Sequence, residues 1–170
     1  MVIWLIGISG SGKTTLGRML ETYYKNKGKS CYLLDGDEVR NLFDNDLGYS
    51  DKEREANIKR IILGAYLLDK NDIIGIICNI SPFQKLRDLA REKISGYNEI
   101  YLERDIETSI RRDVKGMYRS NIGKTELVGL GQKFDTPTKS DLHINTDSMT
   151  EVESFEIIKE FIIQKYGNEY

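Results

Sequence analysis

Hydrophobic and polar positions divide the 170-residue chain into short apolar runs separated by longer amphipathic segments. Runs rich in β-branched and aromatic residues predict strands at 2–6, 31–34, 73–78, 99–103 and 141–145. Apolar residues at helical spacing predict helices near 13–27, 51–70, 84–95, 105–113 and 150–165. Strands that alternate with helices are typical of a parallel sheet covered on both faces. We therefore expect a three-layer α/β fold in one domain, residues 1–170.

The stretch GISGSGKT, residues 7–14, lies between the first predicted strand and the first predicted helix, and we call it the phosphate loop. Its glycines let the backbone curl around a phosphate chain, and the helix that follows adds its positive N-terminal end. Lys13 can reach the terminal phosphates, and the Thr14 hydroxyl can bind Mg²⁺. This pattern predicts a nucleoside triphosphate site. Its expected contacts are Gly7, Ser9, Gly10, Ser11, Gly12, Lys13, Thr14 and Thr15.

A second polar cluster, LLDGDEVR at 33–40, ends the next predicted strand. Ligands of open parallel sheets bind beyond the carboxyl ends of the strands, so Asp35 and Asp37 are expected near the phosphate loop. We assign Asp37 as the base for an acceptor hydroxyl and Asp35 to the Mg²⁺ shell, although these roles could be exchanged. Arg40, one helical turn further, would reach a substrate anion. On spacing alone, Asp37 could instead cap a helix while Asp35 shapes the turn.

Composition narrows the class of protein. The formal net charge is −2 and no long basic run is present, so nucleic acid is not an expected partner. No signal peptide or membrane-length apolar run is found, and we expect a cytoplasmic protein without a membrane partner. Cys31 and Cys78 fall in predicted strands, where buried reduced thiols are expected. The single histidine, His143, is expected to be structural.

The ordered motifs of the chain resemble those of the adenylylsulfate kinase family. They are GISGSGKTTL, LLDGDEVR, LGYSDKEREANIKR, ISPF and RRDVKGMY, and they cover most of the chain from residue 2 to about 147. The resemblance implies a doubly wound fold of the P-loop nucleoside-kinase type. It also implies transfer of phosphate from MgATP to the 3′-hydroxyl of a small-molecule acceptor, adenosine 5′-phosphosulfate, by a homodimer.

The region 115–140 is polar, glycine-containing and without sustained periodicity. Loops of this length inside a compact domain are usually functional or disordered. Next to a phosphate site, such a loop is expected to be a mobile lid that closes over the bound nucleotides.

The resemblance assigns roles to further residues. Tyr49 stands where the family stacks an aromatic ring on the acceptor base, while Arg54 and Asn57 match its substrate contacts. Arg112 matches a positive residue that the family places near the anionic ligands, where it could stabilise charge on the transferring phosphate or lie along the ATP base. The catalytic candidates are Asp37, Lys13 and Arg112. The expected acceptor contacts are Asp37, Arg40, Tyr49, Arg54, Asn57, Ile80, Ser81, Phe83, Lys115 and Leu127, and the expected metal ligands are Thr14 and Asp35.

The ISPF motif follows a predicted strand, so Ile80 and Phe83 are expected to line an apolar wall of the acceptor site. Ser81 could donate to a phosphate or sulfate, or it could cap a strand-to-helix turn. A phosphoserine intermediate is not expected at Ser81, because direct in-line transfer needs only positioning and charge stabilisation.

Departures from the family pattern bear on the acceptor. Leu127 replaces a phenylalanine that covers the second face of adenine, and Gly131 replaces an aspartate. Since stacking a base on an aromatic ring contributes about 1–3 kcal/mol, a smaller pyrimidine is a reasonable occupant. In this respect the chain resembles a variant of the family that phosphorylates cytidine 5′-diphosphoramidate in capsule phosphoramidate synthesis. That resemblance makes the cytidine compound the favoured acceptor, with adenosine 5′-phosphosulfate as the alternative. A non-enzymatic nucleotide switch is a remote third interpretation, because no guanine-specific NKxD motif is present.

Overall fold

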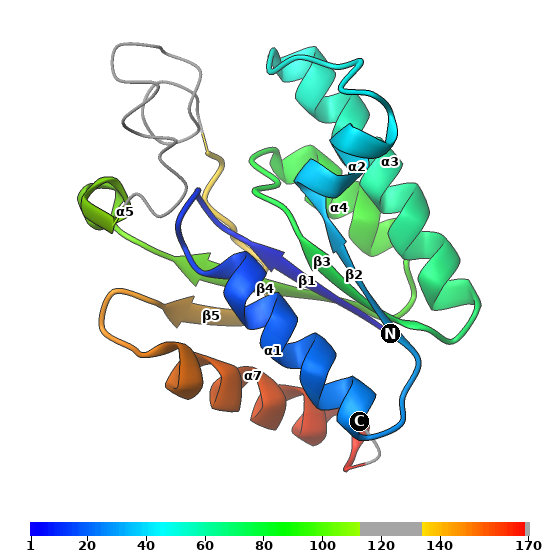
Figure 1. The fold of residues 1–170 in the computed structure, drawn as a ribbon, viewed down its shortest axis with the longest axis vertical. Coiled ribbons are helices and arrows are strands. Elements are labelled where there is room, and N and C mark those ends of the chain that lie inside the picture. Colours follow the sequence, from blue (N-terminus) through cyan, green and yellow to red (C-terminus); the bar gives the residue numbers. More distant parts are fainter. Residues whose placement is uncertain (113–133, 169–170) are drawn as a thin grey trace.

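The computed structural model describes residues 1–112 and 134–168. In these residues one parallel sheet has the strand order β2-β3-β1-β4-β5 (Figure 1). Its strands are β1 (Val2–Ile6), β2 (Cys31–Asp35), β3 (Ile74–Cys78), β4 (Tyr97–Glu103) and β5 (Leu142–Asn145). All neighbouring strands are parallel; from β1 the chain crosses to the edge strand β2, returns to β3 beside β1, and then continues on the other side of β1 through β4 to β5. The predicted doubly wound α/β fold is therefore confirmed.

Helices of the described residues connect these strands. They are α1 (Lys13–Asn26), α2 (Gly36–Leu42), α3 (Asp51–Lys70), α4 (Gln84–Lys93), α5 (Ile106–Arg112) and α7 (Glu151–Tyr166). The five helices predicted from periodicity are present, α3 with the predicted bounds and the others with ends shifted by one or more residues. The separate helix α2 was missed, because its seven residues make barely two turns and start at a glycine.

The side chains of β1 show why the sheet is covered on both faces. Alternate residues of a strand point to opposite faces. Trp4 therefore packs among side chains of α3 and α4, whereas Leu5 packs among side chains of α1 and α7. Figure 1 shows these two helix pairs on opposite sides of the sheet. The continuous apolar run of β1 is explained by this double burial.

The carboxyl ends of the parallel strands bring several connecting segments to one edge of the sheet. The phosphate loop follows β1, α2 follows β2, and the turn at residues 80–83 follows β3. Part of the predicted lid, residues 134–140, is described and precedes β5. Residues 113–133, the rest of that region, lie outside the described residues. The strand topology therefore gathers most of the predicted site residues at one edge.

Candidate active site

The phosphate loop curls through glycine conformations that other residues rarely adopt. Gly7 and Gly12 have φ values of 145° and 95°. A Cβ at Gly7 would also collide with the carbonyl oxygen of Leu102 on the neighbouring strand. Gly12 is the N-cap of α1 and supplies no side-chain hydrogen bond to the helix. Because glycine has no side chain, no N-cap side chain accepts a hydrogen bond from the first N–H groups of α1. Such N–H groups at a helix N-terminus suit an anion site.

Lys13 folds back onto the phosphate loop in this structure. Its Nζ donates to the carbonyl oxygens of Gly7 and Ile8, at 2.8 and 2.7 Å. Binding of a triphosphate by this ammonium would exchange loop carbonyls for phosphate oxygens. Among the other predicted ATP contacts, Ser11 is fully buried, whereas Thr15 is exposed.

Thr14 and Asp35 come together although they lie 21 residues apart in sequence. Thr14 Oγ1 donates to Asp35 Oδ2 at 3.0 Å. Hydroxyl and carboxylate oxygens are the ligand types that suit Mg²⁺, which usually keeps several waters and phosphate oxygens as further ligands. No group of three or more His, Cys, Asp or Glu side chains suited to a metal occurs in the part of the chain that the structure describes. The residues present thus fit a magnesium ion carried in with ATP.

Asp35, rather than Asp37, caps α2. Asp35 Oδ1 accepts a hydrogen bond from the backbone N–H of Asp37 at 3.0 Å. The alternative interpretation, in which Asp37 caps the helix, is therefore wrong. The reason is that the N-cap side chain bonds the second or third N–H of the helix, and Asp37 is already inside the first turn. Asp37 is exposed there, at the carboxyl end of β2.

Arg40, Tyr49 and Arg54 form a cluster above α2 and the start of α3. The guanidinium carbons of Arg40 and Arg54 lie 4.6 and 5.2 Å from the centre of the Tyr49 ring. Arg40 Nη1 also donates to the carbonyls of Leu47 and Gly48, both at 2.9 Å. The Tyr49 ring is 52% exposed, so it offers an aromatic surface flanked by two cations.

Asn57 is more deeply placed than the sequence suggested. It is 2% exposed, and its Nδ2 donates to the carbonyl of Gly36 at 3.4 Å. Its Oδ1 is buried and has no hydrogen-bond partner among the described residues. In this structure the side chain joins α3 to the start of α2, so any contact with an acceptor requires that helix to move.

Ser81 points into the protein rather than toward a ligand. The residue is 1% exposed and has a φ of 49°. Its Oγ accepts from Trp4 Nε1 and donates to Asn79 Oδ1, both at 3.0 Å. The hydroxyl therefore has no second hydrogen to donate to a phosphate or sulfate. It does not cap α4 either, because the N-cap is Phe83. Ile80 and Phe83 are both half-buried on either side of it.

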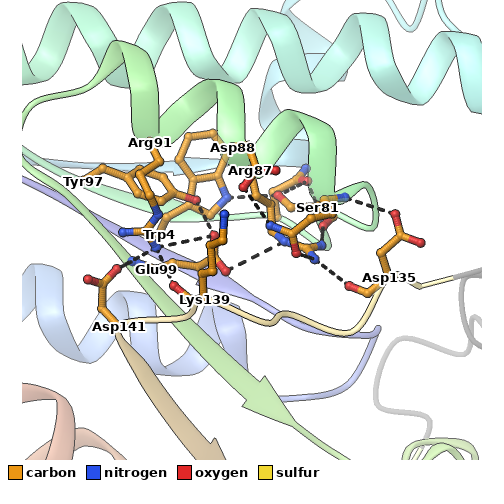
Figure 2. Close-up of polar contacts among 12 residues, drawn as sticks. Trp4, Ser81, Arg87, Asp88, Arg91, Tyr97, Glu99, Asp135, Lys139 and Asp141 are labelled. Atoms are coloured by element: carbon orange, nitrogen blue, oxygen red, sulfur yellow. Dashed lines mark hydrogen bonds and ion pairs between the residues drawn. The ribbon is translucent and has the colours of Figure 1, made fainter.

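A buried polar network, which was not predicted from the sequence, supports this turn (Figure 2). Arg87 on α4 is 2% exposed and donates to the carbonyls of Ser81 and Asp135, both at 2.6 Å. Its Nε lies 3.8 Å from the carboxylate of Glu99, which also accepts from the Tyr97 hydroxyl at 2.9 Å. Burial lowers the pKa of Arg87 and raises the pKa of Glu99. We call these contacts the Arg87 network.

The Arg87 network also holds the described end of the predicted lid. The N–H of Asp135 donates to the carbonyl of Pro82 at 2.9 Å. The Asp135 carboxylate accepts from the N–H of Gln84 at 3.1 Å. Residues 134–135 of the predicted lid are thus attached to the turn that precedes α4. The spacing of Arg87 and Arg91 beside buried Leu86 and Ala90 was the available sequence signal.

Three predicted site residues cannot be compared with this geometry. Arg112 is the last residue of α5, and nothing further is described of it. Lys115 and Leu127 lie outside the described residues. His143 on β5 is exposed, with its ring stacked on Tyr101 at 4.9 Å and its Nε2 3.0 Å from Glu103.

Both cysteines lie in strands as predicted, but only Cys78 is buried, and the expectation of a buried thiol is wrong for Cys31, which is half-buried. Cys31 is in β2 and Cys78 is in β3, and no disulfide joins cysteines in residues 1–112 and 134–168. The thiol of Cys78 lies 3.2 Å from the carbonyl of Lys13, beneath the start of α1. None of the helices in those ranges is long and apolar enough to cross a membrane.

A phosphate loop after the first strand, with a Thr–Asp oxygen pair beside it, on a doubly wound sheet, defines a P-loop kinase. The sequence profile described as adenylylsulphate kinase matches residues 1–145. The chain belongs to the adenylylsulfate kinase family, and it is an ATP-dependent nucleotide kinase, a phosphotransferase that uses Mg²⁺.

Similar proteins of known name span nearly the whole chain. The adenylyl-sulfate kinase of Halothermothrix orenii is 38% identical over 167 residues, which are 97% of this chain and 90% of that protein. The adenylyl-sulfate kinase of Saccharomyces cerevisiae is 38% identical over 170 residues, covering 96% and 84% of the two chains. The structure of Mycobacterium tuberculosis APS kinase CysC in complex with AMPPNP and APS has a TM-score of 0.88 at 28% identity. It covers 95% of this chain and 96% of that one.

Proposed function

We propose that this protein transfers the γ-phosphoryl group of MgATP to the 3′-hydroxyl of adenosine 5′-phosphosulfate. The observation that carries the proposal is the course of α2. This helix begins beside the Thr14–Asp35 pair and carries Asp37 in its first turn. One turn later it presents Arg40 against the exposed ring of Tyr49. A phosphoryl donor site and an acceptor site are therefore joined by one short helix, in a chain whose full-length relatives are named adenylyl-sulfate kinases.

The proposed reaction is a direct displacement. The acceptor 3′-oxygen forms a bond to the γ-phosphorus, the bond from that phosphorus to the β,γ-bridging oxygen breaks, and ADP leaves. Asp37 receives the proton of the acceptor hydroxyl. Lys13 and Arg112 stabilise the charge on the transferring group, and Thr14 and Asp35 hold Mg²⁺ directly or through its waters. Ser81 takes no covalent part, because its hydroxyl is committed to Trp4 and Asn79.

The proposed acceptor contacts follow from the Tyr49 cluster. The acceptor base would stack on Tyr49 in place of one of the guanidinium groups that now lie near the ring. Arg40 or Arg54, when displaced from the ring, is available to bind the anionic 5′ group. Ile80 and Phe83 form an apolar wall on the far side, and Lys115 and Leu127 remain candidates from the sequence alone.

A second candidate acceptor is cytidine 5′-diphosphoramidate. The observation in its favour is the sequence change of the family's phenylalanine to Leu127 and of its aspartate to Gly131. The sequence interpretation placed this acceptor first. The comparisons support the adenylyl acceptor better, because the adenylyl-sulfate kinase name recurs among similar proteins across kingdoms.

The deciding experiment measures ADP release from MgATP with each acceptor in parallel. We expect adenosine 5′-phosphosulfate to give the higher kcat/KM. A preference for the cytidine compound would reverse the assignment and give Leu127 a role in base choice. The matched variant is Leu127→Phe, which should shift the preference toward adenine if residue 127 covers the base. Stimulation by neither acceptor would overturn both assignments.

We further propose that the chain forms a homodimer. Leu63 and Leu67 lie one turn apart on α3 and are 59% and 51% exposed, which supports a contact on this helix. A related APS kinase from Thiobacillus denitrificans is described as hexameric, so assemblies vary among similar proteins. Light scattering on the purified chain measures the mass directly. A monomeric mass would contradict the proposal.

A further inference from the structure

One buried arginine joins the phosphate loop to the loop that follows β5. Arg104 comes directly after β4, and its side chain is 8% exposed. Its Nη1 donates to the carbonyl of Gly10 at 2.5 Å, and its Nη2 donates to the carbonyl of Thr146 at 2.7 Å. Its Nε lies 3.7 Å from Asp147 Oδ1. We call these three contacts the Arg104 bridge.

The loop at the far end of the Arg104 bridge is itself firmly held. Asp147 Oδ2 accepts from the N–H of Asp105 at 2.7 Å. Thr146 is 3% exposed, and both its N–H and its hydroxyl donate to the carbonyl of Glu103 at 2.9 Å. The loop after β5 is thereby tied to the end of β4. Arg104 consequently connects the phosphate loop to a fixed support rather than to another loose segment.

The bridge acts on the middle of the phosphate loop. Gly10 has a φ of 80°, and its carbonyl is the group that Arg104 holds. The N–H of Ser11 belongs to the same planar peptide and donates to the carbonyl of Ile8 at 3.3 Å. Both polar groups of this peptide are therefore engaged, so its orientation is set. A phosphate loop binds anions through the directions of its backbone N–H groups, and those directions depend on such peptide orientations.

We propose that Arg104 is a positioning residue for ATP, which fixes the Gly10–Ser11 peptide against the loop after β5 and so presets the phosphate loop. The nearby carboxylate of Asp147 offsets the arginine charge. The contribution to ATP binding therefore comes from two directed hydrogen bonds rather than from a general positive field. A lysine at this position would keep the charge but lack the planar fork that reaches two carbonyls at once.

The position of the bridge separates its effect from the acceptor site. Arg104 and Thr146 follow β4 and β5, on one side of β1 in the strand order, whereas α2 and the Tyr49 cluster follow β2 on the other side. Loss of the bridge should therefore weaken nucleotide binding at the phosphate loop and leave acceptor binding unchanged.

The experiment uses the full chain with Arg104→Ala and Arg104→Lys, and with Arg18→Ala as the control, because Arg18 is exposed on α1. Calorimetry measures the affinity of each variant for the magnesium complex of AMPPNP, and thermal unfolding measures Tm. We expect both Arg104 variants to bind AMPPNP about tenfold more weakly, Arg104→Lys slightly less so, since charge-assisted hydrogen bonds are among the stronger ones. The control should bind as the wild type does.

Three outcomes would overturn the proposal. Unchanged AMPPNP affinity in Arg104→Ala would remove any role for the residue. Wild-type affinity in Arg104→Lys would assign the effect to charge instead of to the bridge. If KM for ATP and KM for the acceptor rise equally while Tm falls, Arg104 only stabilises the fold. The first two outcomes rest on AMPPNP binding, which needs no acceptor, so a wrong acceptor assignment above would leave them intact.

Discussion

The phosphate side and the acceptor side of the candidate site are built differently. On the phosphate side, the loop at 7–14 is held by backbone carbonyls, by Lys13 and by the contact of Thr14 with Asp35. On the acceptor side, Tyr49 is 52% exposed and is flanked by the guanidinium groups of Arg40 and Arg54. The loop on the phosphate side is therefore fixed by contacts within the protein, whereas the aromatic ring on the proposed acceptor side is open to a ligand.

The largest effect is expected from a substitution on the phosphate side. Lys13→Ala should lower kcat about a hundredfold or more, because a positioned cation at the transferring phosphate is lost. The effect should be the same with either acceptor. Steady-state ADP release measures it, and Lys25→Ala, an exposed lysine at the other end of α1, is the matched control. A larger loss with one acceptor than with the other would mean that Lys13 also contacts the acceptor.

Asp37→Asn tests the short helix α2, which connects the phosphate side to the acceptor side. It should lower kcat at least about tenfold while Tm and KM for ATP stay unchanged, because only the proton acceptor is removed. Glu38→Gln, the next residue of the same short helix, serves as control. Near-normal turnover of Asp37→Asn would remove Asp37 as the base.

Tyr49 variants probe the acceptor side alone. Tyr49→Ala should raise KM for the acceptor by roughly 5- to 150-fold, the ratio that corresponds to a stacking energy of about 1–3 kcal/mol. Tyr49→Phe keeps the ring and should behave nearly as the wild type. KM for ATP should not change in either variant, and a parallel rise in that constant would show that the two sides are coupled through α2.

Ser81→Ala tests whether the Ser81 hydroxyl has a structural or a catalytic role. The variant should keep kcat within about threefold, yet lose about 1–3 kcal/mol of unfolding free energy, because the buried Trp4 Nε1 loses its acceptor. Urea unfolding and initial rates measure the two quantities. Loss of activity with unchanged stability would instead give the Ser81 hydroxyl a direct part in catalysis.

The smallest expected effect concerns pH and the Arg87 network. Burial raises the pKa of Glu99 above its ordinary value of 4.5. Above pH 4.5 the folded protein therefore holds this proton more tightly than the unfolded chain, and the contribution of Glu99 to stability falls as pH rises through that range. Glu99→Gln removes this titration, so the Tm of the variant should rise relative to that of the wild type as pH increases. Parallel Tm profiles would contradict a raised pKa.

The phosphate loop and the strands could be predicted from local sequence, because each depends on residues that are close together in the chain. The phosphate loop is one continuous motif between a strand and a helix, and buried strands are recognised by their apolar runs. The helix α2 and the capping role of Asp35 were missed because seven residues give too little periodicity. Local sequence did not determine the acceptor, because the proposed acceptor contacts, such as Tyr49 and Leu127, are far apart in the chain.

The sequence by itself determined the fold class, the phosphate loop and the residue types that meet ATP and Mg²⁺. The tertiary structure alone decided which groups are engaged. It joined Thr14 to Asp35, turned the Ser81 hydroxyl inward to Trp4, and buried Arg87 beside Glu99. It also brought Arg104 to the carbonyl of Gly10, 94 residues away in sequence. Such contacts depend on strand order and on the direction of side chains across the sheet, which no local pattern contains.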